Sequence, residues 1–455
     1  MEHTSFSSEI ATFLAAHPET KYVDAFIFDL CGFPLGKRYP IRDVEKLYAD
    51  GLTMCAAVLL LDAAGNTSDP MGIGVTDGDP DANAKAITGT LAPVPWALEP
   101  TAQVLLEMRN PQTNELVPFQ PREILRGVLD RYQSLGITPV VALELEFYLI
   151  DENRTDDGGP LAVKSPLNGR TASSNQVYSI DTLEEYAPIL AAITDACALQ
   201  GVPAAIASGE FAPGQFELNL NHVADALVAA DHACLLRRIG RSVARTFGME
   251  ATFLAKPFLD QSGSGMHIHM NFSDEHGHNI FHEDIDQGET LMRQAMAGLQ
   301  ATMPESMAIF SPNINGFRRL KPNCYVPVTM DWGYDNRSVA FRIPSGRGQG
   351  KRIEHRVAGA DANPYLVLAS ALAGVHYGLS HRLRPLSEAF SGNAGVEVDP
   401  HLPLTLWRAL DRLDDAPILN EYFGARYLQL YKTVKENELN ALLATALPRE
   451  YEWYL

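Results

Sequence analysis

The sequence predicts an α+β fold with a small N-terminal domain and a large C-terminal domain. Amphipathic helical patterns, of which Pro121–Leu135 is a clear example, occur together with alternating strand patterns such as Val140–Ile150. A turn-rich stretch, Asn110–Pro121, separates the short N-terminal elements from the longer C-terminal ones. We therefore expect the first domain to span residues 1–115 and the second residues 116–455.

The composition indicates a folded cytoplasmic protein. Hydrophobic residues make up 46% and charged residues 20% of the 455 positions, as in ordinary globular proteins. No apolar run is as long as a membrane span, and the N-terminus lacks the basic start and apolar core of a signal peptide. The five scattered cysteines indicate reduced thiols, and the net charge of −20 argues against nucleic acid as a partner. We expect neither a nucleic-acid nor a membrane partner.

The predicted N-terminal elements are short. Tyr22–Leu30 alternates as a strand does, and the glycines and proline of Gly32–Gly36 predict a turn after it. Gly65–Lys85 is rich in Gly, Asp, Asn and Pro, so we interpret it as a long functional loop. The other N-terminal predictions are helices at Ser8–Ala16 and Arg42–Asp50, and strands at Ala57–Asp62 and Thr101–Met108.

The C-terminal part begins with the helix Pro121–Leu135. This segment has a proline in its first turn, apolar residues along one side, and Gly136 as its stop signal. The strand Val140–Ile150 follows, and then a polar loop, Asp151–Asn175. Further helices are predicted at Leu183–Gln200, Ala224–Phe247, Glu289–Met303, Ala362–His381 and Leu404–Leu413, and within Ala425–Ala446.

The strand Val140–Ile150 carries two carboxylates in an apolar setting. Alternation places Glu144 and Glu146 on one face and apolar side chains on the other. Desolvating an unpaired charge costs several kcal/mol, so a bound metal ion would explain both carboxylates. Considered alone, the strand fits an exposed sheet edge with a solvated acidic face equally well.

Four further strand-like segments also combine a polar face with an apolar one. In Gln215–Asn221, alternation places Phe216, Leu218 and Leu220 on one face and Glu217 on the other, and Glu210 lies just before that segment. His267 and His269 share one face of Met266–Phe272. The other two segments are Ser338–Ile343, with Arg342 inside it and Arg337 before it, and Arg352–Val357, with Arg352, Glu354 and Arg356 on one face. Five such segments together predict a sheet whose polar face lines a site.

The residue types on this face suit metal-assisted phosphoryl transfer. Five glutamates and one imidazole form an oxygen-rich ligand set, which favours Mg²⁺ or Mn²⁺ over zinc or copper. Their charge could hold two or three divalent ions. Guanidinium groups, which bind phosphate and carboxylate, would come from Arg319, Arg337, Arg342 and Arg356.

These segments resemble the class I glutamine synthetase family. The motifs that carry the resemblance are LELEFYLI, GEFAPGQFELN, GSGMHIHM, NGFRRLKP, DNRSVAFRIP and RIEHRVAGADANPYL, in the family's order between Val140 and Leu366. FDLCGFPLGKR, NQVYSIDTLEEY, LAGVHYGL and the C-terminal EYEWYL are similar to the γ-glutamylpolyamine branch, which includes γ-glutamylputrescine synthetase. The resemblance implies an N-terminal β-grasp domain and a catalytic domain with a curved antiparallel sheet and flanking helices. It also implies a dodecamer of two six-membered rings, with each active site between neighbouring subunits.

The resemblance also assigns expected roles to residues. Glu146, Glu210 and Glu217 match the ligands of one metal ion, and Glu144, His267 and Glu354 match those of a second. His269, Arg337 and Arg342 match residues near the ATP phosphates. Arg319, Arg356 and Gly263 match residues at the glutamate site. In the implied reaction, ATP phosphorylates the γ-carboxylate of glutamate, and an amine nitrogen then displaces phosphate.

Two departures from the family concern the nucleophile. Tyr325 stands where glutamine synthetases have a flap glutamate, and Asp62-Ala-Ala-Gly stands where they have Asp-Gly-Ser-Ser. In the family these two acidic residues bind and deprotonate ammonium. We therefore expect a ligase that joins glutamate to putrescine or another polyamine, with Tyr325 and Asp62 in the amine subsite.

Other functions remain open from the sequence. One is glutamine synthesis from ammonia, and another is ligation of a monoamine such as ethanolamine, an alkylamine or an arylamine. A different class would be a catalytically silent ring scaffold, against which the retained ligand and arginine set argues. The sequence does not identify the amine, the residue that deprotonates it, the regulation or the exact oligomeric state.

Overall fold

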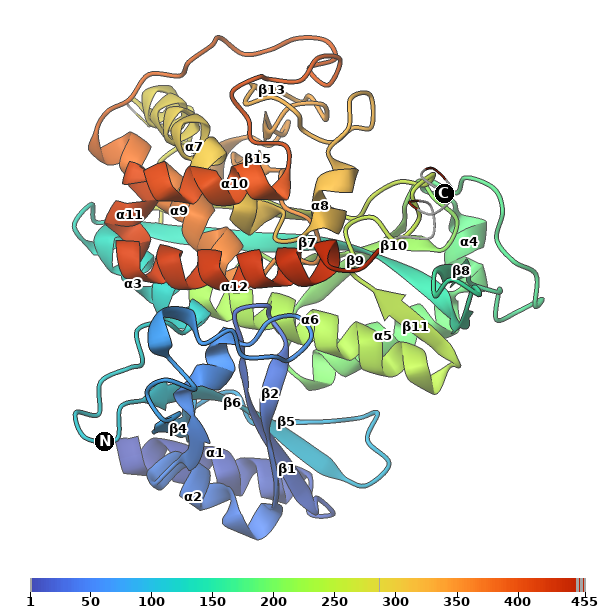
Figure 1. The fold of residues 1–455 in the computed structure, drawn as a ribbon, viewed down its shortest axis with the longest axis vertical. Coiled ribbons are helices and arrows are strands. Elements are labelled where there is room, and N and C mark those ends of the chain that lie inside the picture. The colour runs from blue at the N-terminus through green and yellow to red at the C-terminus, as the bar shows by residue number, and fades with distance from the viewer. Residues whose placement is uncertain (1, 286, 447–449, 451–452, 454–455) are drawn as a thin grey trace.

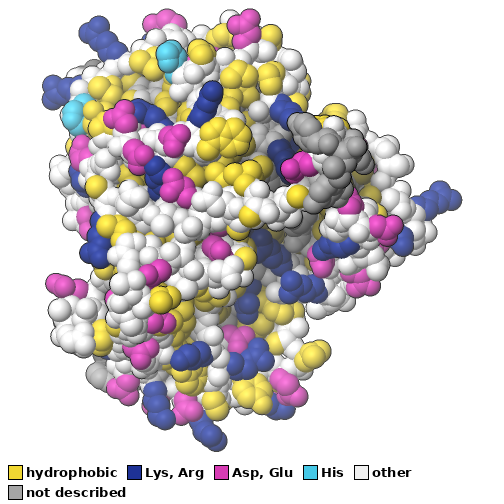
Figure 2. Space-filling view, in the orientation of Figure 1, with side chains coloured by type: hydrophobic (Ala, Val, Ile, Leu, Met, Phe, Trp, Pro, Cys, Tyr) yellow, Lys and Arg dark blue, Asp and Glu magenta, His cyan; other side chains and the backbone are white. Residues whose placement is uncertain are grey.

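The computed structural model describes residues 2–285, 287–446, 450 and 453, and it contains a smaller N-terminal and a larger C-terminal part (Figure 1). Helices and two largely antiparallel sheets are both present, so the α+β prediction is confirmed. Acidic and basic side chains are interspersed over the face shown in Figure 2. Within the described residues, no helix has the length and apolar character needed to cross a membrane.

The N-terminal part is a six-stranded sheet in the order β2-β1-β6-β4-β3, with β5 paired to β6. Strands β1 and β6 pair in parallel, and the other pairs are antiparallel. Ile10 and Phe13 of helix α1 pack in one core with Val23 and Val104 of the sheet. The elements are α1 (Glu2–Ala16), β1 (Tyr22–Phe28), β2 (Pro34–Pro40), η1 (Ile41–Asp43), α2 (Val44–Ala49), β3 (Leu52–Cys55), η2 (Ala56–Leu60), η3 (Pro70–Gly72), β4 (Asp81–Ala86), β5 (Ala92–Pro93) and β6 (Thr101–Arg109).

Two N-terminal predictions are wrong. The expected strand at Ala57–Asp62 is mostly the 3₁₀-helix η2, and the strand β3 precedes it. A short apolar run fits a buried helix as well as a strand, so periodicity could not separate them. The expected loop Gly65–Lys85 ends in strand β4, where buried Ala82 and Ala84 alternate with more accessible residues. Alanine has a weak strand propensity, which concealed this strand.

The C-terminal part contains a nine-stranded sheet in the order β13-β14-β15-β12-β7-β10-β9, with β8 and β11 also paired to β7. Its pairs are antiparallel except β13 with β14. The strands are β7 (Thr138–Arg154), β8 (Pro160–Ala162), β9 (Ala204–Gly209), β10 (Gln215–Leu220), β11 (Met249–Thr252), β12 (Met266–Ser273), β13 (Trp332–Tyr334), β14 (Phe341–Ile343) and β15 (Ile353–His355). The long strand β7 is therefore the centre of the sheet.

Helices cover this sheet and complete the large core. They are α3 (Pro121–Gln133), α4 (Ile180–Glu185), α5 (Ala187–Leu199), α6 (Ala226–Thr246), α7 (Gly288–Phe310), α8 (Ile314–Arg319), α9 (Pro364–Ser380), α10 (Leu406–Arg412), α11 (Pro417–Phe423) and α12 (Ala425–Leu443), with the 3₁₀-helices η4 (Gly348–Gly350) and η5 (Leu413–Asp415). The predicted helix Leu183–Gln200 is divided at Tyr186, where Pro188 begins a new first turn. Helix α7 runs seven residues beyond the predicted end at Met303, passing through Pro304.

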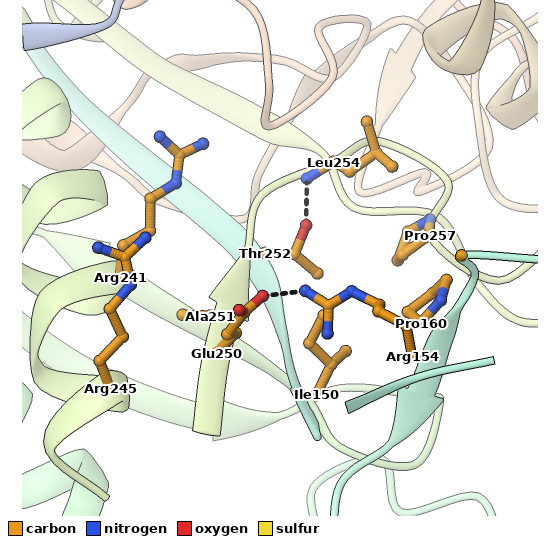
Figure 3. A pocket seen from close by; sticks show the side chains of 11 residues that line it. Ile150, Arg154, Pro160, Arg241, Arg245, Glu250, Ala251, Thr252, Leu254 and Pro257 are labelled. Carbon is orange, nitrogen blue, oxygen red and sulfur yellow. Dashed lines mark hydrogen bonds and ion pairs between the residues drawn. The ribbon is translucent and has the colours of Figure 1, made fainter. Parts of the chain in front are cut away.

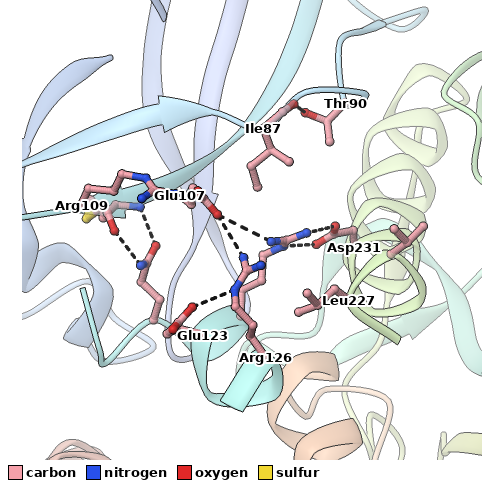
Figure 4. Close-up of polar contacts among 12 residues, drawn as sticks. Ile87, Thr90, Glu107, Arg109, Glu123, Arg126, Leu227 and Asp231 are labelled. Atoms are coloured by element: carbon pink, nitrogen blue, oxygen red, sulfur yellow. Dashed lines mark hydrogen bonds and ion pairs between the residues drawn. The ribbon is translucent and has the colours of Figure 1, made fainter. Parts of the chain in front are cut away.

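A polar network joins the two parts (Figure 4). Glu107 of β6 accepts a hydrogen bond from Arg126 of α3 over 3.1 Å. Arg122, on the same helix, donates to both carboxylate oxygens of Asp231 on α6, over 3.1 and 3.0 Å. The hydroxyl of Tyr365 donates to the same carboxylate over 2.6 Å. Asp231 is buried, and these hydrogen bonds to its carboxylate hold α3, α6 and α9 together. The bond between Glu107 and Arg126 then joins α3 to the N-terminal sheet.

Candidate active site

Strand register assembles the predicted acidic face around β7. Glu144 lies directly opposite His267 of β12, and Glu146 lies directly opposite Glu217 of β10. Directly opposed residues of antiparallel strands project from the same side of the sheet. Accordingly, His267 Nδ1 lies 2.6 Å from Glu144 Oε1, and His267 Nε2 lies 3.9 Å from Glu146 Oε1.

The same face continues across β12 to β15 and β14. Glu354 of β15 is paired in register with His269 on one side and with Arg342 on the other. Arg342 Nη1 donates to Glu354 Oε2 over 2.8 Å, and Arg356 donates to the other oxygen, Oε1. His269 Nε2 lies 3.1 Å from Glu144 Oε2. Glu354 is 1% exposed, so arginines rather than water neutralise its charge.

Three groups of these side chains could each hold a metal ion. In each group, one ligand atom from every member lies within 4.8 Å of the others. The groups are Glu146 with Glu210 and Glu217, Glu144 with Glu217 and His267, and Glu144 with His269 and Glu354. The sequence-predicted ligands therefore lie together in one cluster, although the second predicted trio, Glu144, His267 and Glu354, is divided between two of these groups.

The electrostatics of the cluster show an excess of carboxylates. Burial and the charges of neighbouring glutamates raise the pKa of Glu217 to about 10 and that of Glu210 to about 7. Burial also disfavours charge on Glu354, but Arg356 and the histidines outweigh it and lower the pKa of Glu354 to about 2. The arginine side of the cluster is thus balanced, whereas the Glu210–Glu217 side has too little positive charge, since Arg337 only partly offsets the repulsion at Glu210. A divalent cation there would supply it.

The predicted arginines occupy different environments. Arg319 is 4% exposed and donates to the carbonyl oxygen of Val357 over 2.8 Å. Gly263 lies against it, since a Cβ at that position would be 2.7 Å from Arg319 Cγ and 2.8 Å from the carbonyl oxygen of Ala255. Only glycine therefore fits at position 263. Arg337 is exposed in the turn before β14, outside the strand that holds Arg342. Strand alternation therefore does not relate the directions of these two side chains, which are an odd number of residues apart.

Neither predicted amine-site residue contacts the cluster within the described chain. Tyr325 is 77% exposed and has a left-handed backbone, with φ of 52°. Asp62 is buried in its own loop, where its Oδ1 accepts from the backbone N–H groups of Ala64 and Asn66 over 2.9 and 2.7 Å. Both residues thus lie on loops, apart from the strands that carry the acidic face.

Sequence analysis missed two contributors to the site, Gly265 and Asn219, and gave a third, Arg352, no role in it. The backbone N–H of Gly265 donates to Glu146 over 2.7 Å. Almost every residue has a backbone N–H, so the residue type at position 265 could not indicate this contact. Asn219 donates to Glu217 over 2.8 Å, and its parity, two residues after Glu217, could have identified it. Arg352 donates to His269 Nδ1 over 3.1 Å. The alternation of its strand placed Arg352 on the same face as Glu354 but did not indicate the contact with His269.

Comparisons with known proteins identify relatives of this chain. Residues 118–454 match the family described as glutamine synthetase, catalytic domain. The chain is 37% identical to gamma-glutamylputrescine synthetase of Escherichia coli over 99% of its own length and 95% of the relative's. It is 30% identical to gamma-glutamylethanolamide synthetase of Streptomyces coelicolor over 91% of this chain and 88% of that one. The predicted family resemblance is thereby confirmed.

A solved structure has the same fold. The unliganded form of GmaS superposes with a TM-score of 0.82 at 25% identity, covering 97% of this chain and 98% of the other. The likeness extends over both sheets and their helices.

Proposed function

This chain belongs to the glutamine synthetase family, and we propose that it is an ATP-dependent ligase that joins the γ-carboxylate of glutamate to an organic primary amine. The γ-carboxylate attacks the terminal phosphoryl group of ATP, giving γ-glutamyl phosphate and ADP. The amine then loses a proton, attacks the acyl carbon and expels phosphate, which leaves a γ-glutamyl amide. Putrescine or another polyamine is the first candidate because the relative with the higher identity is named for putrescine.

The acidic cluster fits two or three Mg²⁺ or Mn²⁺ ions. Half-buried carboxylates with raised pKa values, together with one imidazole, form the oxygen-rich donor set that these ions prefer. The proposed ligands are Glu144, Glu146, Glu210, Glu217, His267 and Glu354. Bound there, the ions would offset the negative charge of the triphosphate and of the transferred phosphoryl group.

The chain's own groups would orient both substrates. We assign Arg337, Arg342 and His269 to the ATP phosphates, with Arg352 holding the His269 ring through its Nδ1. Arg319, Arg356 and Gly263 would receive glutamate, whose carboxylates match the planar fork of a guanidinium group. Arg342 and Arg356 also hold Glu354 from two sides, so substrate binding and the shape of the acidic face are coupled.

The choice of an organic amine over ammonia depends on one observation. Position 325, where the family's ammonia-using members carry a glutamate, is an exposed tyrosine on a loop. An aromatic ring lacks the negative charge that a glutamate offers to ammonium, but it can hold an alkylammonium group against its face by a cation–π contact. A glutamine synthetase that uses ammonia is the alternative within the same chemistry, and Tyr325 argues against it.

A single assay separates these functions. Glutamate-dependent phosphate release would be measured with ammonia, putrescine, spermidine, ethanolamine and isopropylamine under identical conditions. We expect a much larger kcat/KM for an organic amine than for ammonia. Equal or better use of ammonia would identify a glutamine synthetase, and no phosphate release with any amine would point to a catalytically silent scaffold.

We further propose that the enzyme is a ring oligomer, with twelve subunits as the expected state. The N-terminal loop that carries Asp62 does not contact the acidic face of its own chain in the described residues. A neighbouring subunit in a closed ring could supply this loop.

A further inference from the structure

A pocket separate from the acidic cluster lies where helix α6 ends beside strand β11 (Figure 3). Its volume is about 350 Å³, which falls in the range of small-molecule sites. The end of β7 and the start of β8 form the opposite wall, with apolar surface from Ile150 and Pro160. None of the residues proposed above for metal, ATP or glutamate lines it.

Two arginines in this pocket have no hydrogen-bond acceptor among the described residues. Arg241 and Arg245 are four residues apart on α6 and therefore lie on the same side of the helix. Across the residues that the structure describes, neither guanidinium has a hydrogen bond or an ion pair. Arg241 is half-buried and lies against two aromatic rings, with its Cζ 5.8 Å from the centroid of Phe33 and 5.7 Å from that of Phe253.

The neighbouring charges do not supply the missing anion. Glu250 also lines the pocket, but it is already paired with Arg154. Asp361 also acts on Arg241, but its Oδ2 accepts from Asn313 over 2.9 Å. Burial and the positive charges of Arg237 and Arg245 outweigh it and lower the pKa of Arg241 to about 9. Two adjacent cations, one of them partly desolvated, are costly without a counter-charge. Two adjacent arginines without a paired carboxylate are unusual in a chain whose net charge is −20.

A hydroxyl group adds a third donor. Thr252 of β11 lines the pocket, and its Oγ1 accepts from the backbone N–H of Leu254 over 3.2 Å. Because that contact uses an oxygen lone pair, the hydroxyl proton is available to a ligand. The pocket therefore offers two guanidinium forks and one O–H beside apolar walls.

We propose that this pocket binds a small organic dianion, through Arg241 and Arg245 to its charged group and through the apolar wall to its carbon body. A phosphoryl group and a dicarboxylate both match paired guanidinium forks. The apolar wall favours a ligand with carbon atoms over inorganic phosphate. The site is independent of the proposed ligase reaction, since it shares no residue with it.

Calorimetric titration of the full-length protein without divalent metal tests this site. The probes are glycerol 3-phosphate, succinate and inorganic phosphate. We expect glycerol 3-phosphate or succinate to bind at one site per chain, more tightly than inorganic phosphate. Whether glycerol 3-phosphate or succinate binds more tightly shows whether the pocket recognises a phosphoryl group or a dicarboxylate. Arg245→Gln and Arg241→Gln should each weaken that binding by about tenfold or more, because each removes a charge-assisted contact.

Two matched variants control the experiment. Arg408→Gln removes an exposed arginine on α10, far from the pocket lining, and should bind the probe as the wild type does. Arg337→Gln removes an arginine of the proposed ATP site and should also retain binding. Because Arg245 is exposed, its variant will fold even if Arg241→Gln does not. Absence of binding for all three probes, unchanged binding in Arg245→Gln, or loss of binding in Arg337→Gln would each overturn the proposal.

Discussion

His267 Nδ1 lies 2.6 Å from Glu144 Oε1, and the two residues face each other directly across strands β12 and β7. Neither residue sits on a loop, so their separation is set by the spacing of two hydrogen-bonded strands. The same is true of Glu146 with Glu217. The central part of the proposed metal site is therefore positioned by paired strands rather than by loops.

We predict that Glu146→Ala and Glu354→Ala will reduce ligase activity by orders of magnitude while the protein stays folded. Each removes a carboxylate from a shared cluster, so the triphosphate would lose its aligned counter-charge. Steady-state rates at ordinary Mg²⁺ and circular dichroism provide the measurements. Glu152→Ala, on the exposed end of the same strand, is the matched control and should be fully active.

Metal binding can be observed without turnover. Adding Mg²⁺ or Mn²⁺ to chelator-treated wild type should raise its thermal midpoint, since a ligand that binds only the folded state stabilises it. The rise should be much smaller in Glu146→Ala and unchanged in Glu152→Ala. An equal rise in all three proteins would remove Glu146 from the ligand set.

The acidic face was predictable from sequence because it depends on strand alternation alone. Parity in Val140–Ile150 and Met266–Phe272 determined which side chains share a face, and the register confirmed that they meet. The family resemblance supplied the expected roles of the residues on that face. Sequence analysis failed where local signals are ambiguous, as in the apolar 3₁₀-helix η2 and the alanine-containing strand β4. The positions of Tyr325 and Asp62 depend on loop conformation, which no periodicity encodes.

The packing of α3, α6 and α9 against one another should depend on Asp231. We expect Asp231→Ala to lower the thermal midpoint strongly, because it leaves Arg122 and the Tyr365 hydroxyl without their shared buried acceptor. Breaking a buried ion pair by removing one partner costs about 3–5 kcal/mol. Thermal unfolding followed by circular dichroism measures the change. Glu99→Ala, which breaks an exposed pair with Lys21, is the control and should shift the midpoint little. Similar shifts in both variants would show that the buried network contributes no more than a surface pair.

Complementation between inactive variants tests whether sites form between subunits. We predict that Asp62→Asn and Glu354→Ala are each poorly active alone, and that hetero-oligomers of the two regain activity. With random mixing across a heterologous ring interface, up to about a quarter of the sites would combine an intact Asp62 loop with an intact acidic face. Co-expression with two affinity tags isolates the mixed oligomers, and sedimentation reports their size. Mixed oligomers that remain as inactive as their parents, or a fully active monomer, would contradict a shared site.

The last prediction concerns how Tyr325 selects the nucleophile. A primary amine and ammonia are both mostly protonated at neutral pH, so each must be bound as a cation and deprotonated before it attacks the acyl phosphate. Ammonium needs a compact anionic pocket, which a tyrosine does not supply. An alkylammonium group can instead lie on the aromatic ring, in a contact worth roughly 0.5–2 kcal/mol. Tyr325 is 77% exposed on its loop, so this ring is free to meet a substrate.

We therefore expect the Tyr325→Phe variant to keep most of its activity with the preferred organic amine, since the aromatic ring remains. The Tyr325→Ala variant should lose about threefold to thirtyfold in kcat/KM for that amine, as the loss of a cation–π contact predicts. Tyr325→Glu should weaken organic-amine use and gain some activity with ammonia, although the Asp62 loop also differs from the ammonia-using pattern. The KM for ATP should stay unchanged in all three variants, which separates an amine-site effect from a general loss of structure. If Tyr325→Ala retains the wild-type kcat/KM for every amine, the residue only packs within its loop, and the selectivity for organic amines must come from elsewhere in the site.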